Sequence, residues 1–392
     1  MPNLPRLIQP RLAEYLASFP AVLVTGPRQA GKSTLLQMQL PQASLIDLDD
    51  VRTSAEVSVD PYLALALRKR PLIVDEVQAY PEILKVIKVL IDQERHLRGT
   101  YALTGSQVFP LMAGVTESLA GRVGILELLP MAWKEYGQGF PTEQEVLGLM
   151  LRGGYPSLAV DPACDREAWL NSYLNSYVER DIRALQAVQD LVRFRIFLKL
   201  LAGRVGELLN LHSLASDAGI SVNTAKDWIS LLETTYVVFR LTPWHRNQNK
   251  RLVKMPKIYF WDTGLLTFLA GIDGPERLGS DRQIGHIFEN FVITELRKQA
   301  TALSPRHECF FYRTHDGGEV DLLLQSAQGW HAIEIKWGSH TAADEVRTLV
   351  ELTLDQPLVS KVVLCPSRTT RVVAANVLQR HWAEIDFGGE PN

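Results

Sequence analysis

The chain has 392 residues, of which 46% are hydrophobic and 22% are charged. A chain of this length and composition can bury two or three ordinary cores, which excludes a disordered or low-complexity protein. The 41 basic and 44 acidic residues leave a formal charge of −3, which excludes a protein held to nucleic acid by bulk positive charge. Any contact with nucleic acid is therefore expected to be local.

Cysteine usage and hydropathy indicate the compartment. Cys164, Cys309 and Cys365 lie far apart and form no C-x-x-C pair, so neither a disulfide framework nor a structural zinc site is expected. No apolar run approaches the length of about 18 residues that a membrane span needs. We therefore expect a cytoplasmic protein without a membrane partner.

Residues 1–140 alternate short apolar runs with helical patterns, which is typical of an α/β domain. Continuous apolar strands separated by helices imply crossover connections, so we expect a parallel sheet covered on both faces. Ligands of such sheets bind at the carboxyl ends of the strands. The predicted strands are 21–25, 44–48, 72–74 and 101–104.

A phosphate-binding loop is predicted directly after the first strand, where the sequence matches G-x-x-x-x-G-K-[ST]. Its glycines let backbone amides curl around phosphate oxygens, Lys32 reaches the β- and γ-phosphates, and Ser33 holds Mg²⁺. The alternative is an ordinary tight turn between a strand and a helix. The residues expected to contact the nucleotide are Gly26, Pro27, Arg28, Gln29, Ala30, Gly31, Lys32, Ser33 and Thr34.

The strand predicted at 72–74 ends in two adjacent acids, Asp75 and Glu76. Asp75 would bind Mg²⁺ through water, and Glu76 would position and polarise the attacking water. Two carboxylates can also cap a strand without further purpose. Their position 40 residues after a phosphate-binding loop favours catalysis, so ATP and Mg²⁺ are the expected cofactors.

Three more residues are candidates for the nucleotide site. Thr104 and Ser106 follow a later strand and could sense the γ-phosphate, although the same sequence also forms ordinary turns. Arg122 could act as a catalytic finger on the nucleotide of a neighbouring subunit, or it could form a surface salt bridge. The finger requires a homo-oligomer, whose assembly we expect to depend on ATP.

Residues 141–204 read as a helical bridge, and residues 205–279 as a winged helix. Within the predicted winged helix, residues 234–261 form a basic strip that has six basic residues and no acid. This separation of charge predicts a surface that contacts DNA phosphates. The alternative is a surface that docks a protein or is only solvated, because the acidic Asp227 lies on the helix that would read the DNA. The winged-helix elements are predicted at 211–219, 221–235, 237–241 and 257–261. The six basic residues are Arg240, Arg246, Lys250, Arg251, Lys254 and Lys257. The expected DNA contacts are Lys226, Arg240, Arg246, Lys250, Arg251 and Lys254.

The last segment, 280–392, has the element order αβββαβ. Its predicted helices are 283–299 and 344–354, and its predicted strands are 309–313, 320–325, 330–336 and 361–365.

Four charged residues of this segment form a candidate second site. Glu289 lies on the first helix, Asp321 on a strand, and Glu334 and Lys336 on one face of the next strand. Asp321 and Glu334 would supply oxygen ligands for Mg²⁺, and Lys336 would orient or activate a hydrolytic water. This arrangement predicts metal-dependent phosphodiester hydrolysis; the alternative is a core that binds DNA or protein without cutting.

Together these motifs resemble a family of prokaryotic AAA+-type ATPases whose C-terminal part is a domain of unknown function. The resemblance spans nearly the whole chain and implies an AAA+-like core, a winged helix and an end similar to the PD-(D/E)XK nuclease fold. In that fold Glu289, Asp321, Glu334 and Lys336 would occupy the motif positions, although Val320 replaces the usual proline before Asp321. The motifs are residues 26–33, 74–78, 103–106, 119–122 and 319–321.

Two functions of different classes follow from the sequence. The leading hypothesis is a Mg²⁺-dependent ATPase that couples its nucleotide state to DNA binding, with or without nuclease activity. The second is a nucleotide-gated binding protein whose nuclease-like end is inactive and serves as a docking surface. A small-molecule kinase is disfavoured because nothing resembles an acceptor pocket and Glu76 suits water better than an alcohol.

Overall fold

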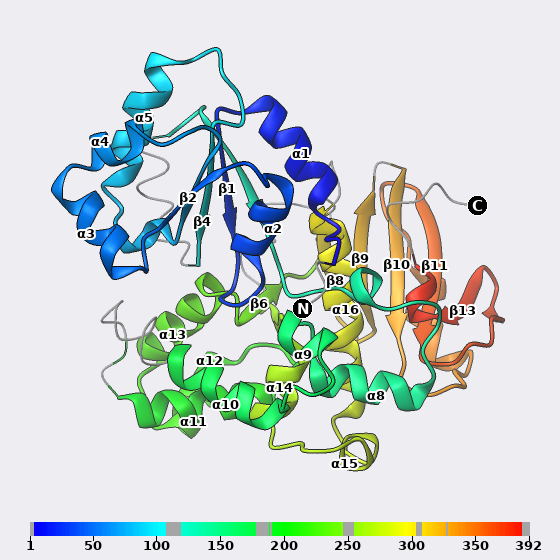
Figure 1. The fold of residues 1–392 in the computed structure, drawn as a ribbon. Coiled ribbons are helices and arrows are strands. Elements are labelled where there is room, and N and C mark those ends of the chain that lie inside the picture. Colours follow the sequence, from blue (N-terminus) through cyan, green and yellow to red (C-terminus); the bar gives the residue numbers. More distant parts are fainter. Residues whose placement is uncertain are drawn as a thin grey trace. The chain divides into compact units, whose positions relative to one another are not determined.

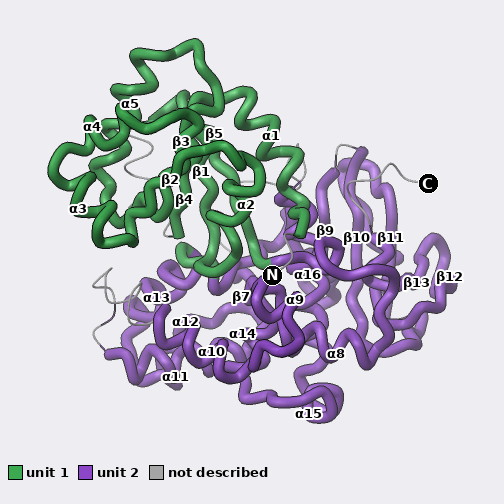
Figure 2. Tube along the Cα trace, viewed as in Figure 1, with its two compact units in different colours: residues 1–130, 234–236 green, residues 131–233, 237–392 purple. Residues whose placement is uncertain are grey.

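The structure is a computed structural model that describes residues 4–106, 119–177, 188, 190–245, 255–302, 308–326 and 328–385. The chain divides into two compact units (Figure 2). Unit 1 comprises Met1–Pro130 with Thr234–Tyr236, and unit 2 comprises Met131–Glu233 with Val237–Asn392. The predicted subdivision of the chain at 140, 204 and 279 stays a prediction.

Unit 1 is built on a five-stranded sheet with the order β2-β3-β4-β1-β5, in which every neighbouring pair is parallel. The four predicted strands are present, and the fifth, β5, which was not predicted, alternates between half-buried and buried positions. The strands are β1 (Ala21–Thr25), β2 (Ser44–Asp47), β3 (Leu72–Asp75), β4 (Tyr101–Gly105) and β5 (Val123–Glu127).

Helices cover both faces of this sheet (Figure 1). On one face, Leu23 of β1 and Leu103 of β4 belong to the same buried cluster as Ile87, which comes from the apolar side of α5. On the other face lie α1 and α2, which contact strands of the sheet and each other. The helices are α1 (Gln9–Ser18), α2 (Lys32–Gln39), α3 (Val51–Val59), α4 (Pro61–Ala66) and α5 (Ile83–Gln93).

The strand order positions the first candidate site. Because β4 lies between β1 and β3, the carboxyl ends of these three strands are neighbours at one edge of the sheet. Thr25, Asp75 and Thr104 stand at or near those ends. Residues from three separate motifs are thus brought together, as parallel sheets do at their ligand-binding edge.

The first half of unit 2 is helical, and short polar side chains define where its helices begin. Asn210 accepts a hydrogen bond from Ser213 N at 3.1 Å and caps α12, and Gly219, with φ of +66°, ends that helix. Ser221 Oγ then accepts from Thr224 N at 3.0 Å at the start of α13. The helices are α7 (Trp133–Tyr136), α8 (Glu143–Arg152), α9 (Pro156–Val160), α10 (Arg166–Ser176), α11 (Leu191–Ala202), α12 (Leu211–Ala218), α13 (Val222–Thr234), α14 (Thr263–Leu269) and α15 (Pro275–Gly279).

An antiparallel pair of strands, β6 (Val238–Leu241) and β7 (Lys257–Phe260), follows α13 in the chain. Helix α12, the turn, helix α13 and these two strands are therefore all present where the sequence predicted them. Their identification as a winged helix stays a prediction.

The second half of unit 2 is a six-stranded mixed sheet with the order β12-β13-β11-β10-β9-β8. The elements predicted through 365 are found, and the sheet then continues with β12 and β13, which were not predicted. Leu323 of β9, Ala332 of β10 and Val363 of β11 form one buried apolar cluster with Leu349 of α17. The elements are α16 (Ile284–Ala302), β8 (Cys309–Arg313), β9 (Glu319–Ser326), β10 (Gly329–Ile335), α17 (Arg347–Glu351), β11 (Leu358–Cys365), β12 (Arg371–Ala374) and β13 (Val377–His381).

Candidate functional site

The loop between β1 and α2 has the backbone that phosphate binding requires. Gly26 and Gly31 have φ of +144° and +91°, a region that favours glycine, and Gly31 stands at the start of α2. A Cβ atom on Gly26 would lie 2.0 Å from the carbonyl oxygen of Leu128, so a side chain does not fit there. The loop therefore keeps a tight curve of the kind that lets backbone amides bind an anion.

The lysine of this loop is folded back over it. Lys32 Nζ donates to the carbonyl oxygens of Gly26 at 3.2 Å and Pro27 at 2.9 Å, and the side chain is buried. Its ammonium thus lies against the phosphate-binding loop, where the phosphate of a nucleotide would bind. Of the other predicted nucleotide contacts, Arg28 is half-buried and Thr34 is exposed on the first turn of α2.

A chain of hydrogen bonds joins the loop to the ends of β3 and β4. Ser33 Oγ lies 2.7 Å from both carboxylate oxygens of Asp75. Thr104 Oγ1 donates to Asp75 Oδ1 and accepts from Glu76 N at 3.0 Å. A hydroxyl and a carboxylate at this spacing are oxygen donors of the kind that Mg²⁺ prefers, so Ser33 and Asp75 fit the predicted ion.

The second acid of the pair is held by two polar neighbours. Gln78 Nε2 donates to Glu76 Oε2 and to Ser106 Oγ, the latter at 3.0 Å. Ser106 Oγ in turn lies 3.3 Å from Glu76 Oε2. The structure therefore brings Thr104 and Ser106 to the two acids, and it adds Gln78, which the sequence reasoning missed although it lies two residues after Glu76.

Two further residues of this site were also missed. Arg6 is buried and donates to the carbonyl oxygens of Ala30 at 2.8 Å and Leu129 at 2.7 Å, so it supports the phosphate-binding loop. The hydroxyl of Tyr236 lies 3.0 Å from Thr25 Oγ1, in the residue before the loop. No local signal marks either residue, because both act on segments far away in the chain.

Arg122 has a partner within its own unit. Its guanidinium donates to both carboxylate oxygens of Asp92, with Nε at 2.9 Å from Oδ1 and Nη2 at 3.1 Å from Oδ2. This is the salt bridge that was the alternative to the catalytic finger. A finger acting on a neighbouring subunit stays a prediction.

The acids of unit 2 surround a buried lysine. Lys257 Nζ, from β7, lies 3.0 Å from Glu289 Oε1 on α16 and also contacts Glu319 on β9. Tyr259 Oη donates to the same oxygen of Glu289 at 2.5 Å. Only 3% of Lys257 is exposed, so this residue does not belong to an exposed basic strip, which corrects the prediction from its sequence neighbours.

Charges within the cluster shift its pKa values strongly. Burial disfavours the charged form of Glu289, but Lys257 and hydrogen bonds from His286 and Tyr259 lower the pKa of Glu289 to about 2. Burial likewise disfavours the ammonium of Lys257, and the surrounding carboxylates nevertheless raise its pKa above the ordinary value. The buried pair is therefore charged at neutral pH.

The predicted metal ligands lie beside this pair. Asp321 Oδ2 accepts from Ile335 N at 2.8 Å, and burial together with the charges of Glu334 and Glu289 raises the pKa of Asp321 well above its usual range. Glu334 Oε1 pairs with Lys336 Nζ at 2.8 Å. Burial raises the pKa of Glu334 as well, against the opposing effect of Lys336.

Each predicted metal ligand already has a protein partner, the backbone amide of Ile335 for Asp321 and the ammonium of Lys336 for Glu334. Within the part of the chain that the structure describes, no three acidic, histidine or cysteine side chains are placed to hold a metal ion. Positive charge beside these acids comes from Lys336, which pairs with Glu334, and from Lys257, which pairs with Glu289 and Glu319. That Asp321 and Glu334 bind Mg²⁺ while Lys336 activates water stays a prediction.

The predicted DNA contacts are only partly visible. Lys226 is exposed on α13. Arg240 is engaged by an acid of the same unit, with Nε 2.7 Å from Glu233 Oε1 and Nη2 2.6 Å from Glu233 Oε2, which weakens its case as a phosphate contact. The remaining four, Arg246, Lys250, Arg251 and Lys254, lie outside the described residues.

Comparison with known families divides the chain into three matched segments. Residues 18–137 match an AAA domain. Residues 143–276 and 284–379 match two domains of unknown function, DUF8612 and DUF4143. Among the described helices, none is long and apolar enough to cross a membrane.

Several proteins are similar to this chain. The uncharacterized protein Rv2008c of Mycobacterium tuberculosis is 33% identical over 328 residues, which is 83% of this chain and 72% of that protein. An uncharacterized protein of Haemophilus influenzae is 21% identical over 337 residues, 78% of this chain and 79% of its own length. The Walker-type ATPase PABY2304 of Pyrococcus abyssi aligns with 67% of this chain and 94% of its own, at 18% identity and a TM-score of 0.45.

Proposed function

The chain belongs to the same family as Rv2008c of Mycobacterium tuberculosis and carries an AAA domain, and from that premise we propose that it binds ATP with Mg²⁺ and hydrolyses it. One observation carries the proposal. The hydrogen-bonded series Ser33, Asp75, Thr104 and Glu76 stands beside a loop whose glycines permit phosphate binding.

The residues of this site divide the work of phosphoryl transfer. Lys32 offsets charge on the phosphates, and Ser33 and Asp75 hold the ion. When bound, Mg²⁺ would offset the negative charge of the phosphates. Glu76 orients a water molecule through its carboxylate, while Gln78 and Ser106 keep that carboxylate in place.

The test is phosphate release and nucleotide binding by two variants. Lys32→Ala should lose hydrolysis and weaken ATP binding, whereas Glu76→Gln should lose hydrolysis and retain bound ATP. Lys69→Ala, which removes an exposed lysine of the same unit, is the matched control. Normal turnover in both site variants would refute the proposed site.

We also propose that ATP binding is coupled to DNA binding through α12, α13, β6 and β7, arranged as a winged helix. The support is the order of these elements and the basic composition of residues 246–254. Binding through phosphate contacts should weaken steeply with salt. A salt titration of DNA affinity with and without ATP tests the coupling, and equal affinities in both states contradict it.

The terminal sheet, which we propose to be similar to the PD-(D/E)XK nuclease fold, has two candidate functions. One is metal-dependent cleavage of nucleic acid by Asp321, Glu334 and Lys336. The other is docking without cleavage, and the ammonium of Lys257 among the acids favours it. Incubation of several nucleic-acid forms with Mg²⁺ separates the two, because cleavage that disappears in Asp321→Ala would establish the nuclease.

A further inference from the structure

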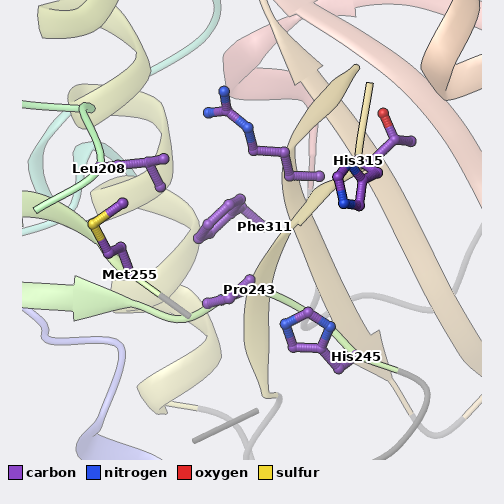
Figure 3. Close-up of a pocket in the computed structure, with 8 residues that line it drawn as sticks. Leu208, Pro243, His245, Met255, Phe311 and His315 are labelled. Atoms are coloured by element: carbon purple, nitrogen blue, oxygen red, sulfur yellow. The ribbon is translucent and has the colours of Figure 1, made fainter. Parts of the chain in front are cut away.

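A pocket in unit 2 lies apart from the residues that any prediction used for chemistry. It has a volume of about 260 Å³. Figure 3 shows Phe311 in the middle of its wall, with Leu208 and Met255 on one side and His315 on the other. The lining residues are Leu208, Pro243, His245, Met255, Phe311, Arg313, Thr314 and His315.

Backbone hydrogen bonds hold the walls of the pocket in place. Phe311 N donates to Thr242 O at 3.1 Å and Trp244 N donates to Phe311 O at 2.7 Å, so the segment after β6 runs along β8. On the other side Leu209 N donates to Pro256 O at 2.8 Å. The pocket is therefore formed by paired strands rather than by a single loop.

The lining combines an apolar half with a polar half. Leu208, Pro243, Met255 and Phe311 offer apolar surface, including one aromatic ring. The remaining four residues offer a guanidinium, a hydroxyl and two imidazoles, and none of the eight is acidic. Such a combination suits a flat aromatic heterocycle that carries a negative charge.

The charges next to the pocket also favour a negatively charged ligand. Arg313 Nη1 pairs with Glu319 Oε2 at 3.2 Å, but the carboxylate of Glu319 is shared with the buried Lys257. Lys257 Nζ itself lies 5.7 Å from the centroid of the Phe311 ring. One carboxylate thus serves two cations, which favours an anionic ligand at Arg313.

The chain connects this pocket with the most basic part of the sequence. His245 and Met255, both in the lining, are the residues on either side of 246–254. Those nine residues contain four basic residues and no acid. Basic residues thus stand next to two lining residues in the sequence, and a local excess of positive charge attracts a polyanion.

We propose that this pocket takes one unpaired base of a single-stranded nucleic acid, with the base against Phe311 and its phosphate at Arg313. The proposal rests on the proposed nucleic-acid contact and names the form of nucleic acid that this contact selects. Bases of single strands stack on aromatic side chains, whereas a paired base is held inside the duplex. The volume, slightly below the roughly 300 Å³ at which pockets for drug-sized ligands begin, suits a single ring system.

The test measures binding of a labelled single strand of roughly 12 nucleotides to the full chain by fluorescence anisotropy. Met255→Trp fills the pocket from an exposed position, and Leu208→Trp fills it from the opposite wall. Both should weaken binding about 5- to 100-fold, the range expected for loss of one stacked base. Arg313→Gln should weaken binding and lower the salt dependence by about one phosphate contact.

Two controls separate this proposal from the function on which it rests. Arg347→Gln removes the same charge from an exposed ion pair on α17 and should bind as the wild type does. A strand with abasic sites should lose affinity to the same extent as the filled pocket. If filled variants bind normally, or the abasic strand binds as tightly, the base pocket is refuted while nucleic-acid binding stands. If the wild type binds duplex DNA but no single strand, only the base pocket fails; if it binds neither, both proposals fail.

Discussion

The two units hold similar residue types in opposite arrangements. In unit 1, Lys32 binds carbonyl oxygens of its own loop, and Asp75 accepts hydrogen bonds from the hydroxyls of Ser33 and Thr104. In unit 2, Lys257 binds the carboxylates of Glu289 and Glu319 directly. Acids that meet only hydroxyls keep their affinity for a cation, whereas acids that surround an ammonium are already neutralised. The hydrogen-bond or ion-pair partner of each acid therefore determines whether that acid can still bind a cation.

The largest effect should come from removing the buried cation. Lys257→Met leaves Glu289 without its ion-pair partner, and we expect a loss of about 3–5 kcal/mol in the free energy of unfolding. Urea denaturation measures this loss. The double variant with Glu289→Gln should recover part of it, because the buried charge is then also removed.

The same variant tests whether the acids of unit 2 bind a metal ion once the ammonium is removed. Mn²⁺ should raise the melting temperature of Lys257→Met, whose acids are no longer neutralised, and leave the nucleotide-free wild type unchanged. An equal increase in the wild type would show that Lys257 does not stand in the way of a cation.

The next effect concerns the acid of unit 1. Asp75→Asn should reduce Mg²⁺-dependent phosphate release about 100-fold, a typical cost of removing one group that stabilises transition-state charge. The asparagine can still accept from Ser33, so the fold should persist. Glu94→Gln, an exposed acid that follows α5, is the control and should retain full turnover. Unchanged release in Asp75→Asn would contradict the assigned site.

The pH dependence of stability should differ in sign between two acids of unit 2. Because the pKa of Asp321 is raised in the folded chain, its contribution falls as the pH rises above about 4, where the unfolded chain loses its proton. Asp321→Asn should therefore be more stable than the wild type at neutral pH. Urea midpoints across the pH range measure this difference, and a variant less stable at neutral pH contradicts it.

Glu289 should behave in the opposite way. Its folded pKa of about 2 lies below the value of the unfolded chain, so its contribution is present at neutral pH and is lost on acidification toward that pKa. Glu289→Gln should be less stable than the wild type at neutral pH and should approach it in acid. The two variants together test whether Lys257 stabilises the charged form of Glu289 more than that of Asp321.

The smallest effect is expected at Arg122. Its pair with Asp92 is partly exposed, so Arg122→Ala should cost about 0.2–1 kcal/mol of stability, and less at high salt. Phosphate release and sedimentation with ATP complete the measurement. A loss of about 1,000-fold in kcat would instead establish the catalytic finger and with it a homo-oligomer.

Much of the fold could be predicted because its signals are local. The apolar runs of β1, β3 and β4 and the glycines of the phosphate-binding loop all act within a few residues. The short edge strand β5 and the pair β12 and β13 were missed, since their residues become buried only against neighbouring strands.

The sequence by itself determined the AAA-type loop, the acids that follow β3 and the order of most helices and strands, because each depends on residues close together in the chain. Only the tertiary structure decided which charges meet. Arg6 reaches Leu129 across 123 positions, and Lys257 reaches Glu289 across 32. Electrostatic pairing depends on distance in space, which no local pattern of residues encodes.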